Sequence, residues 1–81
     1  MLTYPAHVRL GPPVDGRTLQ ELSTRERYRV NVVLVSRPTR NGVIQDFEPE
    51  PGLRLALHDL CMVVGKRESM NRFERENGLP E

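Results

Sequence analysis

The sequence has no tryptophan, one cysteine and few aromatic residues of any kind. Two Tyr and two Phe make aromatic side chains 5% of the chain, so platforms on which nucleic-acid bases could stack are scarce. Cys61 has no cysteine partner, which excludes an internal disulfide and a zinc site built on cysteine pairs.

The chain also lacks an excess of charge and any long apolar run. Twelve Lys and Arg residues against eleven Asp and Glu residues give a net charge of +1, whereas nucleic-acid-binding domains are strongly basic. The longest apolar run, Leu60 to Val64, has five residues. A membrane helix needs about 20 and a signal-peptide core about 7–15. We therefore expect a soluble cytoplasmic protein with no direct contact to nucleic acid and no insertion into the membrane.

The chain is also short. The 81 residues allow one domain, which we expect to span residues 1–81. A domain of this size buries only about 60% of the surface of its unfolded chain. Its own core is therefore small, and we expect a second copy to stabilise it.

Four segments have the apolar patterns of β-strands. Residues 30–37 carry apolar, mostly β-branched side chains on both faces, with Val32 and Leu34 on one of them. This strand is expected to be central and covered on both faces. Asn41-Gly42 predicts a hairpin turn after it. The predicted strands are residues 7–10, 30–37, 43–47 and 60–64.

A short helix is predicted between the first two strands. It carries Leu19 and Leu22 three residues apart, on one side, and Asp15 is the expected cap. A new helical turn is expected to start at Ser23, because Ser23 and Glu26 have the spacing of a capping box.

A second helix is predicted after the last strand. Met70 and Phe73 face inward, and Gly78 has the position of a left-handed C-terminal cap. The order strand, helix, strand, strand, strand, helix predicts an α+β fold. We expect a small mixed, mostly antiparallel sheet with short helices packed on it.

No motif of an enzyme is present. The glycines do not form a phosphate-binding loop, and His7 and His58 are far apart in sequence with no cysteine pair beside them. Cys61 lies in an apolar strand, where a thiol is usually an inert core group. We therefore predict no catalytic residue, no metal and no cofactor.

Two clusters of charge leave alternatives open. Residues 25–29 hold three arginines, and the fork of a guanidinium group binds phosphate well; a solvated arginine surface is the alternative. Asp46, Glu48 and Glu50 alternate near a turn. They would serve either as calcium ligands, with Asp59 as a fourth, or as a solvated edge that resists strand pairing.

Four segments together resemble the TrkA-C domain, the C-terminal lobe of RCK (regulator of potassium conductance) proteins. They are GRTLQEL at 16–22, ERYRVNVV at 26–33, SR at 36–37 and HDLCMVVG at 58–65. A closing helix with Phe73 follows in the place where the family has one. The order and spacing of the segments carry the resemblance, which covers residues 7–75, the expected core.

The sequence departs from the family pattern at two glycines. The family usually has Gly where this chain has Arg29, before Val30, and where it has His58, before Asp59. Because residues other than glycine disfavour positive φ, ordinary backbone geometry is expected at both. The apolar core pattern is unchanged, so the fold expectation stands.

The resemblance implies a regulatory domain without enzymatic activity. Family members act in the cytoplasm as dimers, and some bind ligands at the dimer interface. The implied partners are a second copy and a membrane channel, transporter or antiporter that moves potassium or another cation. Family proteins usually have a preceding lobe that binds NAD or ATP. These 81 residues contain no such lobe, so no dinucleotide cofactor is carried over. The chain is either a stand-alone protein or a piece of a longer transporter or regulator.

One subset of the family binds cyclic di-AMP in a cleft between two copies. There Arg25 would bind phosphate, Asn31 would hydrogen-bond a base edge, and apolar side chains would flank the adenines. The implied ligand-binding residues are Leu19, Arg25, Asn31, Val32 and Pro49. Two alternatives remain: a ligand-sensing or dimerisation lobe of a transcriptional regulator, and a dimerisation module without a ligand.

Overall fold

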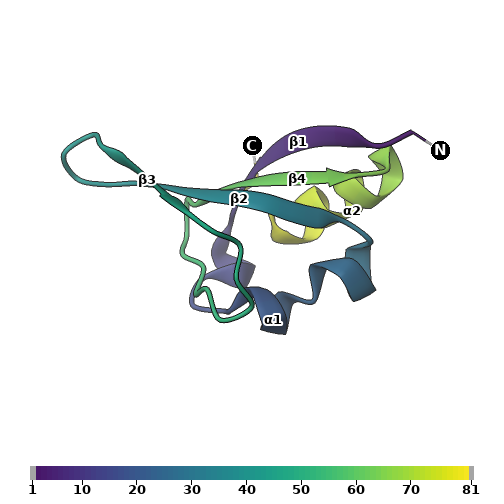
Figure 1. Cartoon of the computed structure of the whole chain (residues 1–81), viewed down its shortest axis with the longest axis horizontal. Coiled ribbons are helices and arrows are strands. Elements are labelled where there is room, and N and C mark those ends of the chain that lie inside the picture. The colour runs from purple at the N-terminus through teal and green to yellow at the C-terminus, as the bar shows by residue number, and fades with distance from the viewer. Residues whose placement is uncertain (1, 81) are drawn as a thin grey trace.

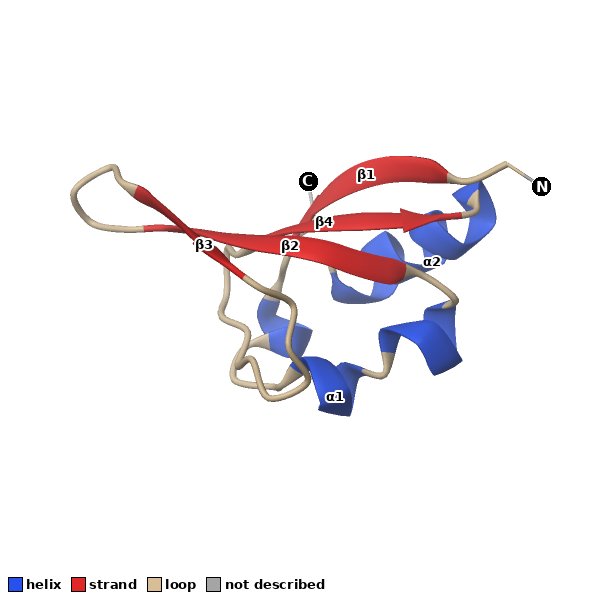
Figure 2. Ribbon diagram, in the orientation of Figure 1, coloured by secondary structure: helices blue, strands red, loops and turns tan. Residues whose placement is uncertain are grey.

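Four antiparallel strands form a sheet, and the helices pack on one of its two faces (Figures 1 and 2). The computed structural model describes residues 2–80. The strand order is β1-β4-β2-β3, so the two central strands are β4 and β2. The predicted α+β fold and the predicted order of its elements are confirmed. The elements are β1 (Tyr4–Arg9), α1 (Leu19–Leu22), β2 (Asn31–Pro38), β3 (Ile44–Phe47), β4 (Leu60–Gly65) and α2 (Arg67–Asn77).

The hydrophobic core lies between the sheet and the helices. Phe73 of α2 is fully buried, and its ring meets that of Tyr28 edge to face, with 5.4 Å between centroids. The predicted inward side of α2 is confirmed, since Met70 is buried with Phe73. The rest of the core comes from every part of the fold: Val8, Leu10, Val14, Leu19, Leu22, Val30, Val35, Leu55, Cys61 and Val63.

The central strand β2 is covered on one face only, and the expectation of two covered faces is wrong. Val32 pairs with Val63 and Leu34 with Met62, which leaves Val33 as the extra residue of a β-bulge. The bulge shifts the alternation by one residue. Val32 therefore packs against the core, whereas Leu34 lies half-buried on the opposite, open face, and Val33 is 44% exposed.

Helix α1 begins later than expected, because its N-cap is Thr18 and not Asp15. Thr18 is its N-cap: the Glu21 N–H donates to the Thr18 hydroxyl at 3.1 Å, and the Thr18 N–H donates to the Glu21 carboxylate at 3.0 Å. The backbone and hydroxyl of Thr18 also lower the pKa of Glu21. Asp15, the expected cap, instead accepts a hydrogen bond from the Leu57 N–H at 3.0 Å.

Ser23 ends α1 and does not start a capping box with Glu26. Its φ of 52° is left-handed, and its hydroxyl donates to the Gln20 carbonyl at 3.0 Å. A single π-helical turn follows at Thr24–Tyr28, which we call the π turn, and it has no side-chain cap. The π turn ends at Arg29, which is also left-handed.

Gly78 is extended, with φ −83° and ψ 163°, so the predicted left-handed cap is wrong. Because Gly78 has no side chain, other backbone segments can pack closely against it. A Cβ at Gly78 would lie 2.6 Å from the Glu74 carbonyl oxygen, and one at Gly11 would lie 2.8 Å from the Gly78 carbonyl oxygen. The Gly11 N–H donates to the Asn77 carbonyl at 2.8 Å. The two glycines thus dock the end of α2 against the end of β1.

Arg29 and His58 both have positive φ, 58° and 74°, which contradicts the geometry expected from the missing glycines. At both positions the backbone has the left-handed conformation that suits glycine, although Arg29 and His58 carry side chains. A left-handed residue with a Cβ costs about 1–2 kcal/mol. Both sites therefore hold strain that glycine would relieve.

Replacing Arg29 with glycine is expected to raise the free energy of unfolding by roughly 0.5–1 kcal/mol. Relief of the left-handed strain outweighs the flexibility that glycine adds to the unfolded chain, about 0.5–1 kcal/mol. Urea denaturation measures the change. Arg25→Gly, an exposed position of the same turn with negative φ, is the control and should lower stability. Equal losses in both variants would contradict the strain at Arg29.

Candidate functional site

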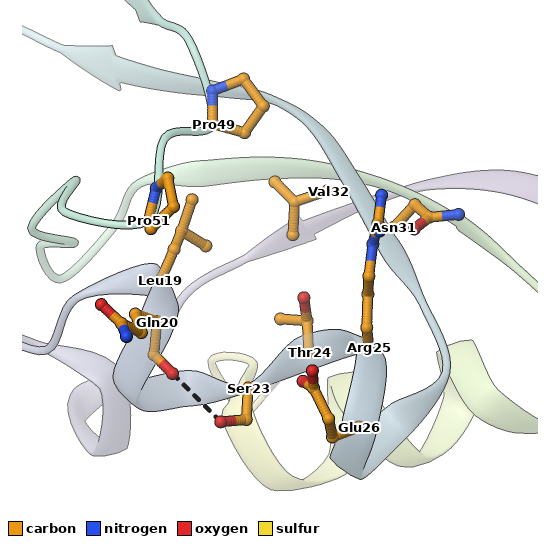
Figure 3. Close-up of a pocket in the computed structure, with 10 residues that line it drawn as sticks. All are labelled: Leu19, Gln20, Ser23, Thr24, Arg25, Glu26, Asn31, Val32, Pro49 and Pro51. Atoms are coloured by element: carbon orange, nitrogen blue, oxygen red, sulfur yellow. Dashed lines mark hydrogen bonds between the residues drawn. The ribbon is translucent and has the colours of Figure 1, made fainter.

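A groove of about 680 Å³ lies on the helical side of the molecule, beside the start of β2 (Figure 3). Its walls come from α1, the π turn, β2 and the loop that follows β3. Its volume is within the range of about 300–1,000 Å³ typical of small-molecule sites. The lining residues are Leu19, Gln20, Ser23, Thr24, Arg25, Glu26, Asn31, Val32, Pro49 and Pro51.

The structure brings all five residues of the predicted site to this groove. They span 31 positions of sequence, from Leu19 to Pro49, and come from four separate segments. Sequence reasoning missed the other five lining residues. Four of these are close chain neighbours of Leu19 or Arg25, and Pro51 follows Pro49 by two residues, so their nearness in sequence was the available signal.

The proline wall of the groove is hydrogen-bonded to α1. The Leu19 N–H donates to the Leu53 carbonyl and the Gln20 N–H to the Pro51 carbonyl, both at 3.0 Å. These are N–H groups of the first helical turn, which have no partner within the helix. The loop that follows β3 thus satisfies them and is held in place next to Leu19.

Arg25 projects from the π turn toward the side of the groove where Asn31 lies (Figure 3). Its side chain is exposed and has neither an ion pair nor a hydrogen bond within residues 2–80. The left-handed residues Ser23 and Arg29 bound the turn that carries it. An unpaired guanidinium at the rim of a groove is suited to bind an anionic oxygen.

Asn31 and Val32 lie where one edge of β2 has no neighbouring strand. The edge strand β3 pairs only with Val35–Pro38. The first residues of β2 therefore have one edge without a strand partner, and the groove runs beside them. The exposed Asn31 side chain supplies an amide donor and acceptor, whereas half-buried Val32 supplies apolar surface.

The groove carries charges of both signs. Glu26 lies one residue from Arg25, and both line it. Each copy of the groove therefore has no net charge from its carboxylate and guanidinium groups. A ligand that places its phosphate at Arg25 can present a hydrogen-bond donor to Glu26.

A second groove of about 680 Å³ lies beside the end of α2. It includes Glu74 and Glu76 but one arginine, Arg75, and its walls contain Pro12, Pro13 and Pro80. Two carboxylates against one guanidinium make it unsuitable for an anionic ligand, and it contains none of the predicted site residues.

The acidic residues singled out in the sequence do not gather at one point. Asp46 accepts a hydrogen bond from the Ser36 hydroxyl at 2.7 Å, whereas Asp59 is buried and paired with Arg37 at 2.8 Å. Among residues 2–80, no three His, Cys, Asp or Glu side chains are grouped so that they could hold a metal ion. The calcium alternative therefore has no geometric support.

Cys61 is a buried core thiol. Burial, and next the negative charge of Asp59, raise its pKa to about 12. It is therefore protonated at neutral pH and unreactive as a nucleophile. No helix in the part of the chain that the structure describes has the length and hydropathy needed to cross a bilayer.

One protein family matches most of the chain. The sequence pattern of the TrkA-C domain matches residues 7–78. A protein of Bacteroides thetaiotaomicron named "Uncharacterized transporter" is 36% identical over 61 residues, which make up 75% of this chain and 10% of the relative. The chain thus spans about a tenth of that transporter's length.

Two solved structures illustrate the fold that this chain shares. The RCK C domain of the potassium transport protein KtrA, in complex with cyclic diadenosine monophosphate, has a TM-score of 0.75 at 20% identity. That match covers 91% of this chain and 82% of the KtrA domain. The GsuK channel bound to NAD has a TM-score of 0.74 at 23% identity, covering 90% of this chain and 13% of the channel. At these identities the likeness shows the fold.

Proposed function

The chain belongs to the TrkA-C domain family, and from this premise we propose that it is a non-enzymatic, ligand-sensing regulatory domain of a potassium or other cation transport system. It works in the cytoplasm as a dimer and meets the membrane through a channel, transporter or antiporter partner. The likeness to a segment of a protein named as a transporter supports a transport role over one in a transcriptional regulator.

We further propose that the groove binds cyclic di-AMP between two copies of the domain. The observation that carries this proposal is that Leu19, Arg25, Asn31, Val32 and Pro49 all line one groove. The KtrA domain, which has the same fold, was solved in complex with cyclic di-AMP itself. A two-fold ligand with two phosphates matches two grooves that each offer one unpaired arginine.

Each group of the groove has a role suited to this ligand. Arg25 donates paired N–H groups to a phosphate, and Asn31 bonds the edge of an adenine. Leu19, Val32 and Pro49 cover the faces of the base. Glu26 accepts a hydrogen bond from an amino or hydroxyl group. Each part of a nucleotide thus has a chemical partner in the groove.

Regulation follows when the two copies can adopt more than one relative orientation. A ligand held between two grooves favours the orientation in which both contact it. It shifts the equilibrium only by the difference between its affinities for the two orientations. The shift is passed to the transport partner as a change in the geometry of the pair.

Arg25→Ala is expected to weaken cyclic di-AMP binding by at least about a hundredfold. A hydrogen bond to a charged group contributes about 1.5–3 kcal/mol, and each ligand meets one Arg25 from each copy. Isothermal titration calorimetry on the wild type and the variant measures the change. Arg40→Ala, an exposed arginine on the β2–β3 hairpin outside the groove, is the matched control and should bind as the wild type does.

Two outcomes would contradict the proposal. The absence of heat with the wild type at millimolar cyclic di-AMP would leave a dimerisation module without this ligand. Equal weakening by Arg25→Ala and Arg40→Ala would indicate general charge attraction and not binding in the groove.

A further inference from the structure

One face of the sheet carries no helix. Helices α1 and α2 and the π turn all lie on the other face (Figure 2). The open face has an apolar centre made by Leu34 of β2 with Leu60, Met62 and Val64 of β4, which are half-buried by their neighbours in the sheet. Val33, the bulge residue beside them, is 44% exposed. Apolar residues at the centre of an open sheet face mark a surface for contact.

The strand register arranges this face in rows, one of which has a charge at each end. In one row Arg9 of β1 pairs with Leu60, Leu60 with Ser36, and Ser36 with Asp46 of β3. Arg9 lies between buried Val8 and Leu10, so alternation places its side chain on the open face. The row is thus basic at the β1 edge, apolar at its centre and acidic at the β3 edge.

The acidic end of the row is held in position by a hydrogen bond. The Ser36 hydroxyl donates to the Asp46 carboxylate at 2.7 Å, and neighbouring positions of a sheet row share one face. In the adjacent row His7, Met62 and Leu34 lie side by side. The apolar centre therefore continues over two rows, and its basic border is the β1 edge.

We propose that the open face of the sheet binds the same face of a second copy of this chain, about a two-fold axis parallel to the strands. This rotation leaves each row at the same position along the strand direction. It reverses the direction across the sheet, so the β1 end of a row in one copy faces the β3 end of the same row in the other copy. Arg9 of each copy then lies opposite Asp46 of the other, and the apolar centres of the two sheets pack together. Aligned sheets pack face to face in this manner, about 10 Å apart.

Charge selects this axis over the alternative. A two-fold axis in the same plane but perpendicular to the strands would set β1 against β1 and β3 against β3. Arg9 would then lie near the basic edge of the second copy, and Asp46 near its acidic edge. Like charges brought together in this way oppose association.

This interface goes beyond the proposed function. The two rows contain none of the residues that line the groove, and the open face meets the groove only at the start of β2, where Val64 pairs with Asn31. The sheet contact therefore forms without a nucleotide. A domain that uses both surfaces links its nucleotide-bridged pairs into a larger assembly.

Charge reversal in solution tests the proposal without nucleotide. Arg9→Asp and Asp46→Arg each turn two attractions of the pair into repulsions and should weaken self-association by at least about tenfold. At a concentration between the dissociation constants of the wild type and the variant, sedimentation should then show a mass shifted from the dimer toward the monomer. The double variant Arg9→Asp/Asp46→Arg restores opposite charges and should restore the mass. Arg25→Ala, which impairs the groove, should keep the wild-type mass.

A cysteine pair tests the geometry directly. Arg9→Cys/Asp46→Cys should form covalent dimers with a bis-maleimide cross-linker that spans about 10 Å, the spacing of packed sheets, whereas either single variant should not. Within one chain the two positions are three strand spacings apart, about 14 Å, beyond the reach of that cross-linker. Buried Cys61 does not compete.

Three results would each overturn the proposal: a wild type that stays monomeric up to millimolar concentration, a double charge variant that stays dissociated, and a cysteine pair that does not cross-link. None of these depends on cyclic di-AMP, so failure here and failure of the nucleotide proposal are distinguishable.

Discussion

Asp59→Ala is expected to lower the free energy of unfolding by about 3 kcal/mol. Asp59 is fully buried, and its two carboxylate oxygens accept hydrogen bonds from Nε and Nη2 of Arg37, each at 2.8 Å. It also accepts the Ala56 N–H at 2.9 Å. Breaking a buried pair by removing one partner costs about 3–5 kcal/mol. The lower end applies because the Arg37 side chain is 31% exposed and reaches water.

The same substitution should also weaken nucleotide binding. Arg37 donates a further hydrogen bond to the Arg54 carbonyl at 3.0 Å, so Arg37 and Asp59 together tie the loop that follows β3 to β2. That loop carries Pro49 and Pro51 to the groove. When it loosens, the apolar wall is no longer fixed next to Leu19.

Urea denaturation measures the loss of stability. Glu48→Ala, an exposed carboxylate without a side-chain hydrogen bond in the described chain, should change stability by no more than about 0.5 kcal/mol. The double variant Arg37→Met/Asp59→Leu leaves no buried unpaired charge and should recover most of the loss. A loss in Asp59→Ala no greater than that in Glu48→Ala would show that the pair does not hold the loop.

The positions of the strands along the chain were predictable because each strand has a strong local pattern, whereas their order within the sheet was not predicted. The β-branched run of β2 and the apolar run of β4 need no tertiary context, and Asn41-Gly42 fixes the hairpin to β3. The bulge at Val33 was not predictable, since Val32, Val33 and Leu34 are all apolar. The contact of each with the core or with the open face is decided by pairing with β4.

The helix start was ambiguous in sequence because two motifs have the same form. Thr18–Glu21 and Ser23–Glu26 both have a hydroxyl residue three positions before a glutamate. The structure selects the first, where the loop that follows β3 accepts the N–H groups of Leu19 and Gln20. A contact between distant segments thus decided a local feature.

The backbone angles at Arg29 and His58 follow from the fold and not from the residues. Arg29 ends the π turn directly before β2, and His58 lies directly before Asp59. The Leu10 carbonyl accepts the His58 N–H at 3.0 Å, so the chain direction there is set by β1. In both places the requirements of the fold outweigh the local preference of non-glycine residues against positive φ.

The candidate site was predictable from family resemblance and not from spacing. Arg25, Asn31 and Pro49 have no shared periodicity, and only the fold brings them to one groove. Glu26 was missed because an exposed glutamate beside an arginine looks like ordinary surface. Its place in the groove becomes visible only when the π turn is seen to face β2 (Figure 3).

The position of Arg25 depends on how the π turn is fixed to the core. Tyr28, at the end of that turn, packs edge to face on Phe73 at 5.4 Å. Its hydroxyl donates to the Glu76 carboxylate at 2.9 Å. Both contacts are with α2, so the interior face of α2 sets the position of the groove's arginine.

Phe73→Ala is therefore expected to remove about 3–5 kcal/mol of stability and to weaken nucleotide binding. Phe73 is fully buried, and its loss opens a cavity beneath the Tyr28 ring. Tyr28→Phe is the matched control: it keeps the aromatic contact, removes the hydrogen bond to Glu76 and should cost about 1 kcal/mol. Urea denaturation and calorimetry at low temperature, where the variant is still folded, measure both effects. If Phe73→Ala were destabilised but bound nucleotide with wild-type affinity, α2 would support the fold without positioning Arg25.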